Sequence, residues 1–337
     1  MAGFPCESLG EDLALKTFNP LNHPICFHAS DRVYVASAWY EHIPFAYYLI
    51  EMAQPKCLVE LGTHNGVSYL AFCQAIQSLS LDTKAFAVDT WGGDEMAGYY
   101  GEEVLSELRA FHDSRYAKFS SLLRMTFDEG ADYFSNGSID LLHIDGLHTY
   151  EAVKHDFENW RKKLTPNAIV IFHDTNVHEN EFGVWRYWEE LREEFKSFEF
   201  YHGHGLGVLT LADSFPAGLS ADNNAEVLKR FRNFFSVLGQ KHLLENNLSM
   251  LRQEFKTQRS QVQKLNDAHI EANEMIIGLT EENNHLKQEQ VSITNQKTDI
   301  ENAFVASQKE ITDCLSSTSW KVTRPFRWIS KKLRGLS

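Results

Sequence analysis

Several features that define other classes of protein are missing from this sequence. Its five cysteines include no CxxC pair, so neither a zinc site nor a disulfide framework is expected, and a reducing compartment is favoured. No apolar run approaches the ~20 residues that a membrane span needs, and the first residues lack the pattern of a secretory signal. The formal net charge of −14 at pH 7 argues against a general nucleic-acid binder. We therefore expect a cytoplasmic protein that does not bind nucleic acid.

Proline is also absent between Pro216 and Pro325, and apolar residues recur there with a 4–3 spacing. One register holds Leu251, Gln258, Leu265, Ala272, Leu279, Leu286, Ile293 and Ile300, and the other holds Phe255, Val262, His269, Ile276, Asn283, Gln290, Lys297, Phe304 and Ile311. This spacing predicts a coiled coil over residues 251–315 and a homo-oligomer, because a long isolated helix needs a packing partner. The polar residues Asn283, Gln290 and Lys297 weaken such a coil but can fix its partner number and register. A lone solvated helix is the alternative.

The segments on either side of the predicted coil differ from it. Residues 216–250 are expected to be a helical connector, with a short helix over residues 225–238 that turns three phenylalanines (Phe231, Phe234 and Phe235) toward the preceding domain. Residues 316–337 form a basic aromatic tail, with six basic residues and no acidic one between residues 319 and 334. Its interleaved tryptophans favour an amphipathic anchor on an anionic membrane surface. A docking peptide for a partner enzyme and a disordered tail are the alternatives.

The stretch from residue 57 to residue 68 has the pattern of a cofactor-binding turn. A short apolar run closes at Glu60 and is followed by Gly62 and Gly66, after which apolar residues take helical spacing as far as residue 79. This pattern predicts a buried strand, a glycine turn and a helix, whose unpaired N–H groups and positive dipole end suit a nucleotide-like cofactor. The next predicted strand ends at Asp89, about 20 residues beyond the last glycine, where ribose hydroxyls are typically bound.

Strands and helices alternate along residues 31–215, the predicted main domain, whereas residues 1–30 read as irregular. Strands are expected at residues 58–61, 86–89, 123–127, 139–145 and 168–172, helices at 37–53, 67–79, 103–111, 150–163 and 182–195, and a closing hairpin at 198–202 and 207–211. Such alternation predicts βαβ units. The expected fold class is therefore α/β: a Rossmann-like, mostly parallel sheet with a terminal antiparallel hairpin, followed by a long α-helical coiled coil.

Acidic and imidazole side chains follow two of these strands. Asp145 ends the strand at residues 139–145, His148 comes three residues later, and His173 and Asp174 end the next strand. Neighbouring strand ends would place all four around one cleft at the carboxyl edge of the sheet. Two carboxylates with imidazoles suit a hard divalent cation such as Mg²⁺ or Mn²⁺, and His148 could accept a proton. Roles in acid–base catalysis or substrate binding stay open for the same residues.

Several motifs occur together between residues 30 and 212. They are Val59-Glu60-Leu61-Gly62 with Gly66-Val67-Ser68, Ala87-Val88-Asp89, His143-Ile144-Asp145-Gly146 with His148 and Tyr150, Phe172-His173-Asp174, and Gly203-His204-Gly205-Leu206-Gly207-Val208. In combination they resemble class I S-adenosylmethionine-dependent methyltransferases, in the family of macrolide-sugar O-methyltransferases and cephalosporin-hydroxylase-type proteins.

The resemblance implies S-adenosylmethionine as cofactor and a set of residues that bind it: Glu60, Gly62, Thr63, Gly66, Ser68, Asp89, Trp91 and Asp128. It implies Asp145, His173 and Asp174 as ligands of Mg²⁺ or Mn²⁺, and His148 with Asp145 as the catalytic residues, His148 being the general base. In the metal-dependent sugar methyltransferases an acidic residue precedes the second ligand Asp. Here that place is His173, whose imidazole can also ligate.

The implied activity is O-methyl transfer to a sugar hydroxyl of a glycan acceptor. Residues 319–327 also resemble C-terminal segments of bacterial enzymes of surface-polysaccharide assembly. This implies a role in polysaccharide biosynthesis, peripheral to the inner face of the cytoplasmic membrane, with a glycosyltransferase as a candidate partner. Two alternatives are a non-catalytic methyltransferase-like scaffold that recruits glycosyltransferases and a hydroxylase-like relative with the same metal cleft.

Overall fold

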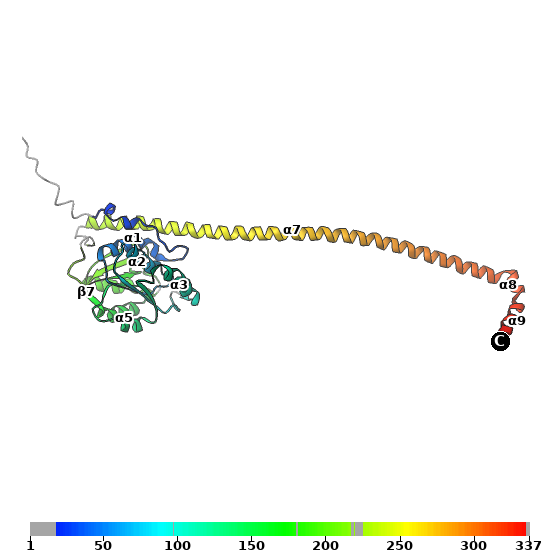
Figure 1. The fold of residues 1–337 in the computed structure, drawn as a ribbon, viewed down its shortest axis with the longest axis horizontal. Helices are drawn as coiled ribbons and strands as arrows, with labels where there is room; N and C mark the ends of the chain where they lie inside the picture. Colours follow the sequence, from blue (N-terminus) through cyan, green and yellow to red (C-terminus); the bar gives the residue numbers. More distant parts are fainter. Residues whose placement is uncertain (1–17, 97, 180, 217–218, 220–224, 335–337) are drawn as a thin grey trace, which may run out of the picture. The chain divides into compact units, whose positions relative to one another are not determined.

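The computed structural model describes residues 18–334, apart from residues 97, 180, 217–218 and 220–224 (Figure 1). The chain divides into two compact units, of which the first ends at Glu254 and the second begins at Phe255. The first unit contains the sheet and every helix that packs on it. Each unit is described by itself below.

A mixed sheet forms the centre of the first unit, with the strand order β5-β2-β1-β6-β7-β9-β8. Its strands are β1 (Cys57–Leu61), β2 (Lys84–Asp89), β5 (Ser120–Arg124), β6 (Ile139–Ile144), β7 (Leu164–His173), β8 (Lys196–Phe200) and β9 (Leu206–Thr210). The first five run parallel, while β9 is antiparallel to both β7 and β8. The predicted Rossmann-like sheet with a terminal antiparallel hairpin is therefore confirmed.

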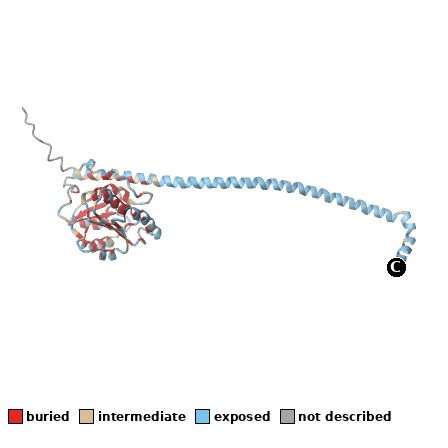
Figure 2. Ribbon diagram, in the orientation of Figure 1, coloured by how far each residue is buried: buried red, intermediate tan, exposed pale blue. Residues whose placement is uncertain are grey.

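Helices cover both faces of this sheet (Figure 1). One layer holds α1 (Ile43–Ala53), α2 (Val67–Ser78) and α3 (Glu102–Tyr116), and the other holds α4 (Phe127–Tyr133), α5 (Tyr150–Arg161) and α6 (Val184–Glu194). Neighbouring strand residues belong to different cores, since Leu141 packs with the first layer and Leu142 with the second. This alternation is the period of two that a pleated strand imposes. Figure 2 shows the buried residues gathered in this layered part of the unit.

The strand expected at residues 123–127 is wrong in its second half. The structure ends β5 at Arg124, and α4 begins at Phe127. Thr126 caps α4, because its side chain accepts a hydrogen bond from the N–H of Glu129 while the Glu129 carboxylate accepts one from the N–H of Thr126. This reciprocal capping box stabilises a helix start and overrides the apolar run that suggested a strand.

Shorter elements precede and interrupt the main pattern. They are three 3-10 helices, η1 (Pro20–Asn22), η2 (Pro24–Phe27) and η3 (Ala38–His42), and a two-stranded ribbon made of β3 (Gly93–Asp94) and β4 (Gly98–Tyr99). The helix expected from residue 37 therefore begins as η3 and becomes α-helical at Ile43. The irregular segment expected at residues 1–30 lies outside the described residues as far as residue 17.

The helix α7 (Ala225–Ser316) begins within the first unit and is longer than the short helix expected at residues 225–238. Its buried residues are Phe231, Phe235, Gly239, His242 and Asn246, a helical spacing that turns one face to the domain. Asn246 binds the chain before η3, because its side chain accepts a hydrogen bond from the Tyr34 N–H at 2.8 Å and donates one to the Val35 carbonyl at 3.1 Å. The first turns of α7 are therefore part of the domain rather than a linker.

The second unit contains the rest of α7, α8 (Thr318–Val322) and α9 (Arg324–Arg334). Nearly all of its described residues are exposed (Figure 2). Among the described residues, no helix combines the length and the apolar character needed to cross a membrane.

Gly239 allows a direct test of how α7 docks. A Cβ at this position would lie 2.0 Å from the carbonyl oxygen of Glu41, whereas one at Gly278 on the same helix would meet nothing within 4 Å. We expect Gly239→Ala to lower the free energy of unfolding of the domain by about 1–3 kcal/mol, the usual cost of overpacking. Urea unfolding followed by tryptophan fluorescence measures this change.

Gly278→Ala is the matched control, since both changes replace a helical glycine by a better helix former. It should leave the unfolding of the domain unchanged. Equal unfolding curves for the two variants would contradict the docking of α7 through Gly239.

Candidate active site

The turn after β1, residues 62–66, is called the glycine turn here. Gly62 has φ +85°, and a Cβ on it would lie 2.0 Å from the carbonyl oxygen of Asp145. The Asp145 N–H in turn donates to the Leu61 carbonyl at 2.9 Å. Only glycine fits this close backbone approach, so the glycine turn lies directly against the carboxyl end of β6. Gly66, with φ +78°, then starts α2.

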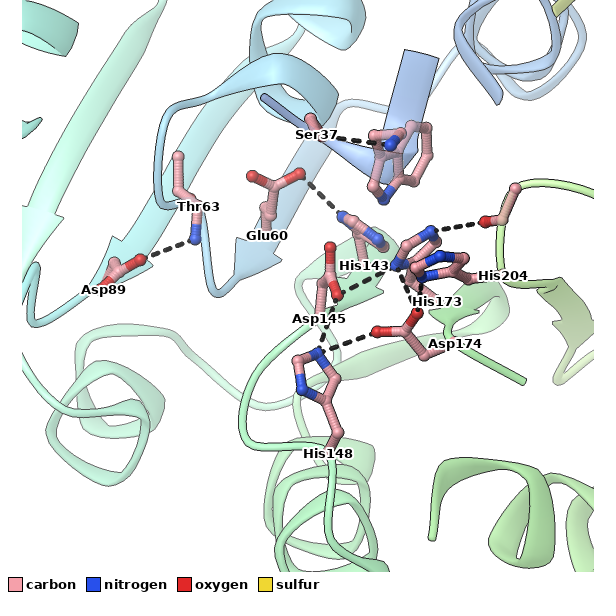
Figure 3. Close-up of polar contacts among 12 residues, drawn as sticks. Ser37, Glu60, Thr63, Asp89, His143, Asp145, His148, His173, Asp174 and His204 are labelled. Atoms are coloured by element: carbon pink, nitrogen blue, oxygen red, sulfur yellow. Dashed lines mark hydrogen bonds and ion pairs between the residues drawn. The ribbon is translucent and has the colours of Figure 1, made fainter. Parts of the chain in front are cut away.

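Asp89 holds the shape of the glycine turn. Its Oδ2 accepts hydrogen bonds from the Thr63 N–H at 2.8 Å (Figure 3) and from the His64 N–H at 2.9 Å. Its Oδ1 accepts one from the Trp91 N–H at 2.6 Å. The sequence predicted Asp89 as a ribose-binding residue. The structure adds a second role, because the Asp89 carboxylate orders three backbone N–H groups. Hydrogen bonds from N–H groups to a carboxylate are charge-assisted.

Glu60 lies in the core beneath the glycine turn. Its side chain and that of His143 have no exposed surface, and 2.7 Å separates Glu60 Oε2 from His143 Nδ1. Burial raises the pKa of Glu60, although the hydrogen bond to His143 opposes that effect. Glu60 does not border the cavity described below. Its contact instead fixes β1 to β6 side by side at the level of the site.

A carboxylate–imidazole cluster, made of Asp145, His148, His173, Asp174 and His204, lies at the carboxyl ends of β6 and β7 (Figure 3). His148 Nε2 lies 3.0 Å from Asp174 Oδ2 and 3.5 Å from Asp145 Oδ1. His173 Nδ1 lies 3.3 Å from Asp145 Oδ1 and 3.4 Å from Asp174 Oδ1. His204 Nδ1 lies 3.2 Å from Asp174 Oδ1. The four residues expected around one cleft are thus brought together, and His204 joins them.

The charges in the carboxylate–imidazole cluster balance one another. Burial acts to raise the pKa of Asp145 and of Asp174, but the imidazoles, chiefly that of His173, lower both. Burial acts to lower the pKa of His148, but its hydrogen bonds to Asp145 and Asp174 raise it to about 9. The pKa of His173 also lies well above its usual range, because the two carboxylates outweigh burial. The carboxylates and the imidazoles therefore stabilise each other's charged forms.

The donor set of the cluster fits a hard divalent cation. One oxygen each from Asp145 and Asp174 and one nitrogen from His148 lie within 4.8 Å of one another. Carboxylate oxygens with an imidazole are ligands that Mg²⁺ and Mn²⁺ accept. His173 donates through Nε2 to the Gly203 carbonyl at 3.1 Å, which leaves its Nδ1 facing both carboxylates. Because the carboxylates raise the pKa of His148 and of His173, a cation at this position would compete with protons on the imidazoles.

A cavity of about 430 Å³ joins the two groups of residues. From the expected set, it is lined by Gly62, Thr63, Gly66, Ser68, Asp89, Asp145, His148, His173 and Asp174. Its size lies within the range of small-molecule sites. Four aspartates border it, and among the described lining residues there is neither lysine nor arginine. The cavity is therefore suited to a neutral or cationic ligand.

Three expected cofactor residues lie elsewhere. Glu60 is buried below the cavity, and Trp91 is buried beside it, with its Nε1 donating to the His64 carbonyl at 3.1 Å. Asp128 lies on α4, where one carboxylate oxygen contacts the side chains of His155 and Asn159, each at 2.8 Å. Glu60 therefore stabilises strand β1 and Trp91 stabilises the glycine turn, whereas the Asp128 side chain faces solvent.

The cavity also has lining residues that the motifs did not indicate, among them Trp39, His64, Asp94, Tyr100, Phe127, Leu147 and His204. Trp39 belongs to η3, and the ring of His64 lies 4.7 Å from that of Tyr100. The sequence carried a weak signal for one of them, since His204 sits between two glycines. Asp174 and His204 both have a positive φ, 61° and 69°, a strained conformation typical of functional sites.

Comparison with known proteins agrees with this geometry. Residues 59–175 match the family model described as a methyltransferase domain. Over 184 residues, or 55% of this chain, the sequence is 50% identical to the uncharacterized protein y4gI of Sinorhizobium fredii (strain NBRC 101917 / NGR234). The matched part is 20% of that relative, so the chain spans about a fifth of its length.

Solved structures with a similar arrangement include a methyltransferase from Geobacter sulfurreducens, at 17% identity and a TM-score of 0.38, covering 50% of this chain and 76% of that one. Another is the O-methyltransferase TomG from Streptomyces achromogenes in complex with SAM, at 13% identity and a TM-score of 0.39, covering 54% and 83%. The family match over residues 59–175 agrees with the methyltransferase resemblance of the sequence motifs.

Proposed function

We propose that this chain is an S-adenosylmethionine-dependent O-methyltransferase that acts on a sugar hydroxyl in the biosynthesis of a surface polysaccharide. The observation that carries the proposal is that one cavity is bordered both by the glycine turn and by the carboxylate–imidazole cluster. A methyl donor and an acceptor hydroxyl need adjoining sites of this kind, because the transfer requires in-line placement of the reacting atoms.

The cofactor half of the cavity has the features that S-adenosylmethionine requires. The cofactor supplies a methyl group on a positively charged sulfonium. Gly62 keeps the turn free of a Cβ, and the start of α2 presents N–H groups and a positive dipole end. Asp89 and Asp94 contribute carboxylates to the lining. We assign Gly62, Thr63, Gly66, Ser68 and Asp89 to this half.

The acceptor half suits an uncharged polyol. Carboxylates and imidazoles offer several hydrogen-bond acceptors and donors to hydroxyl groups. Among the described lining residues there is neither lysine nor arginine, so no ammonium or guanidinium group is available to a phosphate or carboxylate on the acceptor. These two features support a neutral sugar rather than an acidic one.

We assign to His148 the role of accepting the proton that the acceptor hydroxyl loses, once a cation on Asp145 and Asp174 has displaced the proton that these carboxylates hold on its imidazole. Its ring stacks on that of Phe182, with centroids 4.8 Å apart and an interplanar angle of 9°, and its carbonyl accepts a hydrogen bond from the Gly183 N–H at 2.8 Å. Its Nε2 therefore faces the carboxylates at a fixed angle. A cation held by Asp145, His173 and Asp174 would lower the pKa of a bound hydroxyl.

Calorimetric titration of S-adenosylmethionine and S-adenosylhomocysteine, with and without Mg²⁺, tests the cofactor. We expect micromolar dissociation constants, roughly −8 kcal/mol of binding free energy. Asp89→Asn should weaken binding by at least about tenfold, because it removes the charge that orders the turn amides. Asp128→Asn should leave the affinity unchanged, since Asp128 lies outside the cavity.

Failure of both ligands to bind under any condition would overturn the proposal and favour a non-catalytic scaffold. A loss of affinity in Asp128→Asn equal to that in Asp89→Asn would show that the cofactor reaches α4.

His148→Ala tests the proton acceptor. We expect release of S-adenosylhomocysteine, measured with a panel of neutral sugars as acceptors, to fall by about 10²–10⁴-fold, the usual contribution of a general base. Binding of S-adenosylmethionine should stay within about twofold, because the change leaves the glycine turn intact. His155→Ala is the control, since His155 lies on α5 with its side chain in solvent. Near-full activity of His148→Ala would show that the assignment is wrong.

A further inference from the structure

The second unit exposes an apolar stripe along α7. In heptad notation, position a holds Phe255, Val262, Ile276, Phe304 and Ile311, and position d holds Leu265, Leu279, Leu286, Ile293 and Ile300. These side chains are between 55% and 70% exposed. So long a stripe of apolar surface marks an interaction site, because a solitary helix gains nothing from it in water.

We propose that a second copy of this chain covers the stripe, in parallel and in register, as a two-stranded coiled coil. Val262 and Ile276 at position a alternate with Leu265 and Leu279 at position d, a combination that favours two parallel strands. Asn283 at position a adds specificity. In a parallel pair in register it meets Asn283 of the second copy, whereas a shift of one heptad buries one Asn283 against Ile276.

The flanking charges support the same alignment. In a parallel pair in register, each residue at position g lies opposite the residue five places later in the second copy. Glu282 then faces Lys287, an attractive pair, and no like charges meet in the pairs between positions g and e from Phe255 to Ser316, although Lys297 at position a meets Lys297 of the second copy. Lys297 at position a lies 3.9 Å from Glu301 on its own helix, measured from Nζ to Oε1, so its charge is drawn to the flank of the stripe.

Cys314 continues position d and is an exposed free thiol. In a parallel pair in register the two Cys314 side chains lie opposite each other. In an antiparallel pair they lie far apart along the coil. Disulfide crosslinking of Cys314 in the native chain therefore reports whether the two helices run parallel.

Light scattering on the full chain, followed by oxidation with diamide and non-reducing electrophoresis, tests this proposal. We expect twice the mass of the chain and a covalent dimer that Cys314→Ser abolishes. Leu286→Lys at position d should weaken association by at least about 100-fold, because it buries unpaired charge. Gln288→Lys, at the outward position f of the same heptad, is the matched control and should keep the dimer.

A monomeric mass at micromolar concentration would overturn the proposal. A dimeric mass without the Cys314-dependent crosslink would contradict the parallel alignment, and a larger assembly would contradict two strands.

A separate observation concerns α9, which is amphipathic. Phe326, Ile329 and Leu333 share one face at helical spacing and are 73%, 49% and 66% exposed. Arg327, Lys331 and Arg334 fall on the opposite side. The segment from residue 319 to residue 334 has six basic residues and no acidic one, in a chain whose formal net charge is −14. Positive charge is therefore concentrated in this segment, whereas the remainder of the chain carries a net negative charge.

Aromatic rings next to the basic groups complete this surface. The Arg327 guanidinium lies 3.5 Å from the centroid of the Trp320 ring, and Lys332 Nζ lies 4.8 Å from that of Trp328. Tryptophan beside basic residues, next to an apolar face, is the composition of helices that lie in the headgroup region of a bilayer. We infer that α9 binds an anionic phospholipid surface.

Sedimentation of the full chain with vesicles tests this inference. We expect binding to phosphatidylglycerol–phosphatidylcholine vesicles and none to pure phosphatidylcholine. Lys331→Glu should weaken binding by about tenfold or more, since each basic residue near such a surface contributes about 1 kcal/mol. Lys309→Glu on α7, outside the basic segment, is the control and should bind as the native chain does. Equal binding to both vesicles, or to neither, would sink the inference.

Discussion

The approach of Gly62 to the main chain of Asp145 is the constraint on which the cavity depends. A single Cβ at Gly62 would overlap the Asp145 carbonyl, so the backbone itself sets how closely the glycine turn meets the end of β6. Asp89 then fixes the turn from its other side through the N–H groups of Thr63 and His64. The glycine turn and the carboxylate–imidazole cluster are thereby held together around one cavity.

The closeness of the carboxyl ends of β6 and β7 also sets the electrostatics of the carboxylate–imidazole cluster. Asp145 and Asp174 sit on neighbouring strands, so their carboxylates share the imidazoles of His148 and His173 rather than facing water. Either protons on the imidazoles or a bound cation can balance the charge of the two carboxylates. The carboxylates are ionised in both states. The donor set accommodates either state, and the raised pKa of His148 expresses the competition between them.

The parts of this structure that follow from parallel strand topology could be predicted from the sequence. The alternation of strands and helices predicts the mostly parallel sheet, and the rule that parallel strands end at one edge of the sheet predicts the meeting of Asp145 with Asp174. The bonds of Asp89 to turn amides could not be read, because they join a side chain to backbone groups without a sequence signature. His204 reaches the cluster from a loop whose path depends on tertiary packing.

Thr126 shows how a local signal sets the boundary of an element. The apolar residues before it favour a longer strand, but its capping box with Glu129 starts a helix and ends the strand earlier. No local pattern in the sequence places the side chain of Asp128. Since it lies on the first turn of α4, the same capping box that starts this helix decides where Asp128 points.

The beginning of α7 connects the fold to the acceptor side of the site. Phe231 and Phe235 pack against aromatic rings of α1, and Gly239 contacts the Glu41 carbonyl in η3. The same short helix carries Trp39 into the cavity lining, and its last residue, His42, is hydrogen-bonded through Nε2 to the Gly203 carbonyl at 2.9 Å. Because this carbonyl also binds His173, α7 supports an element that contacts the carboxylate–imidazole cluster. The first turns of the helix thus support the site as well as the fold, whereas the apolar stripe farther along the same helix is exposed.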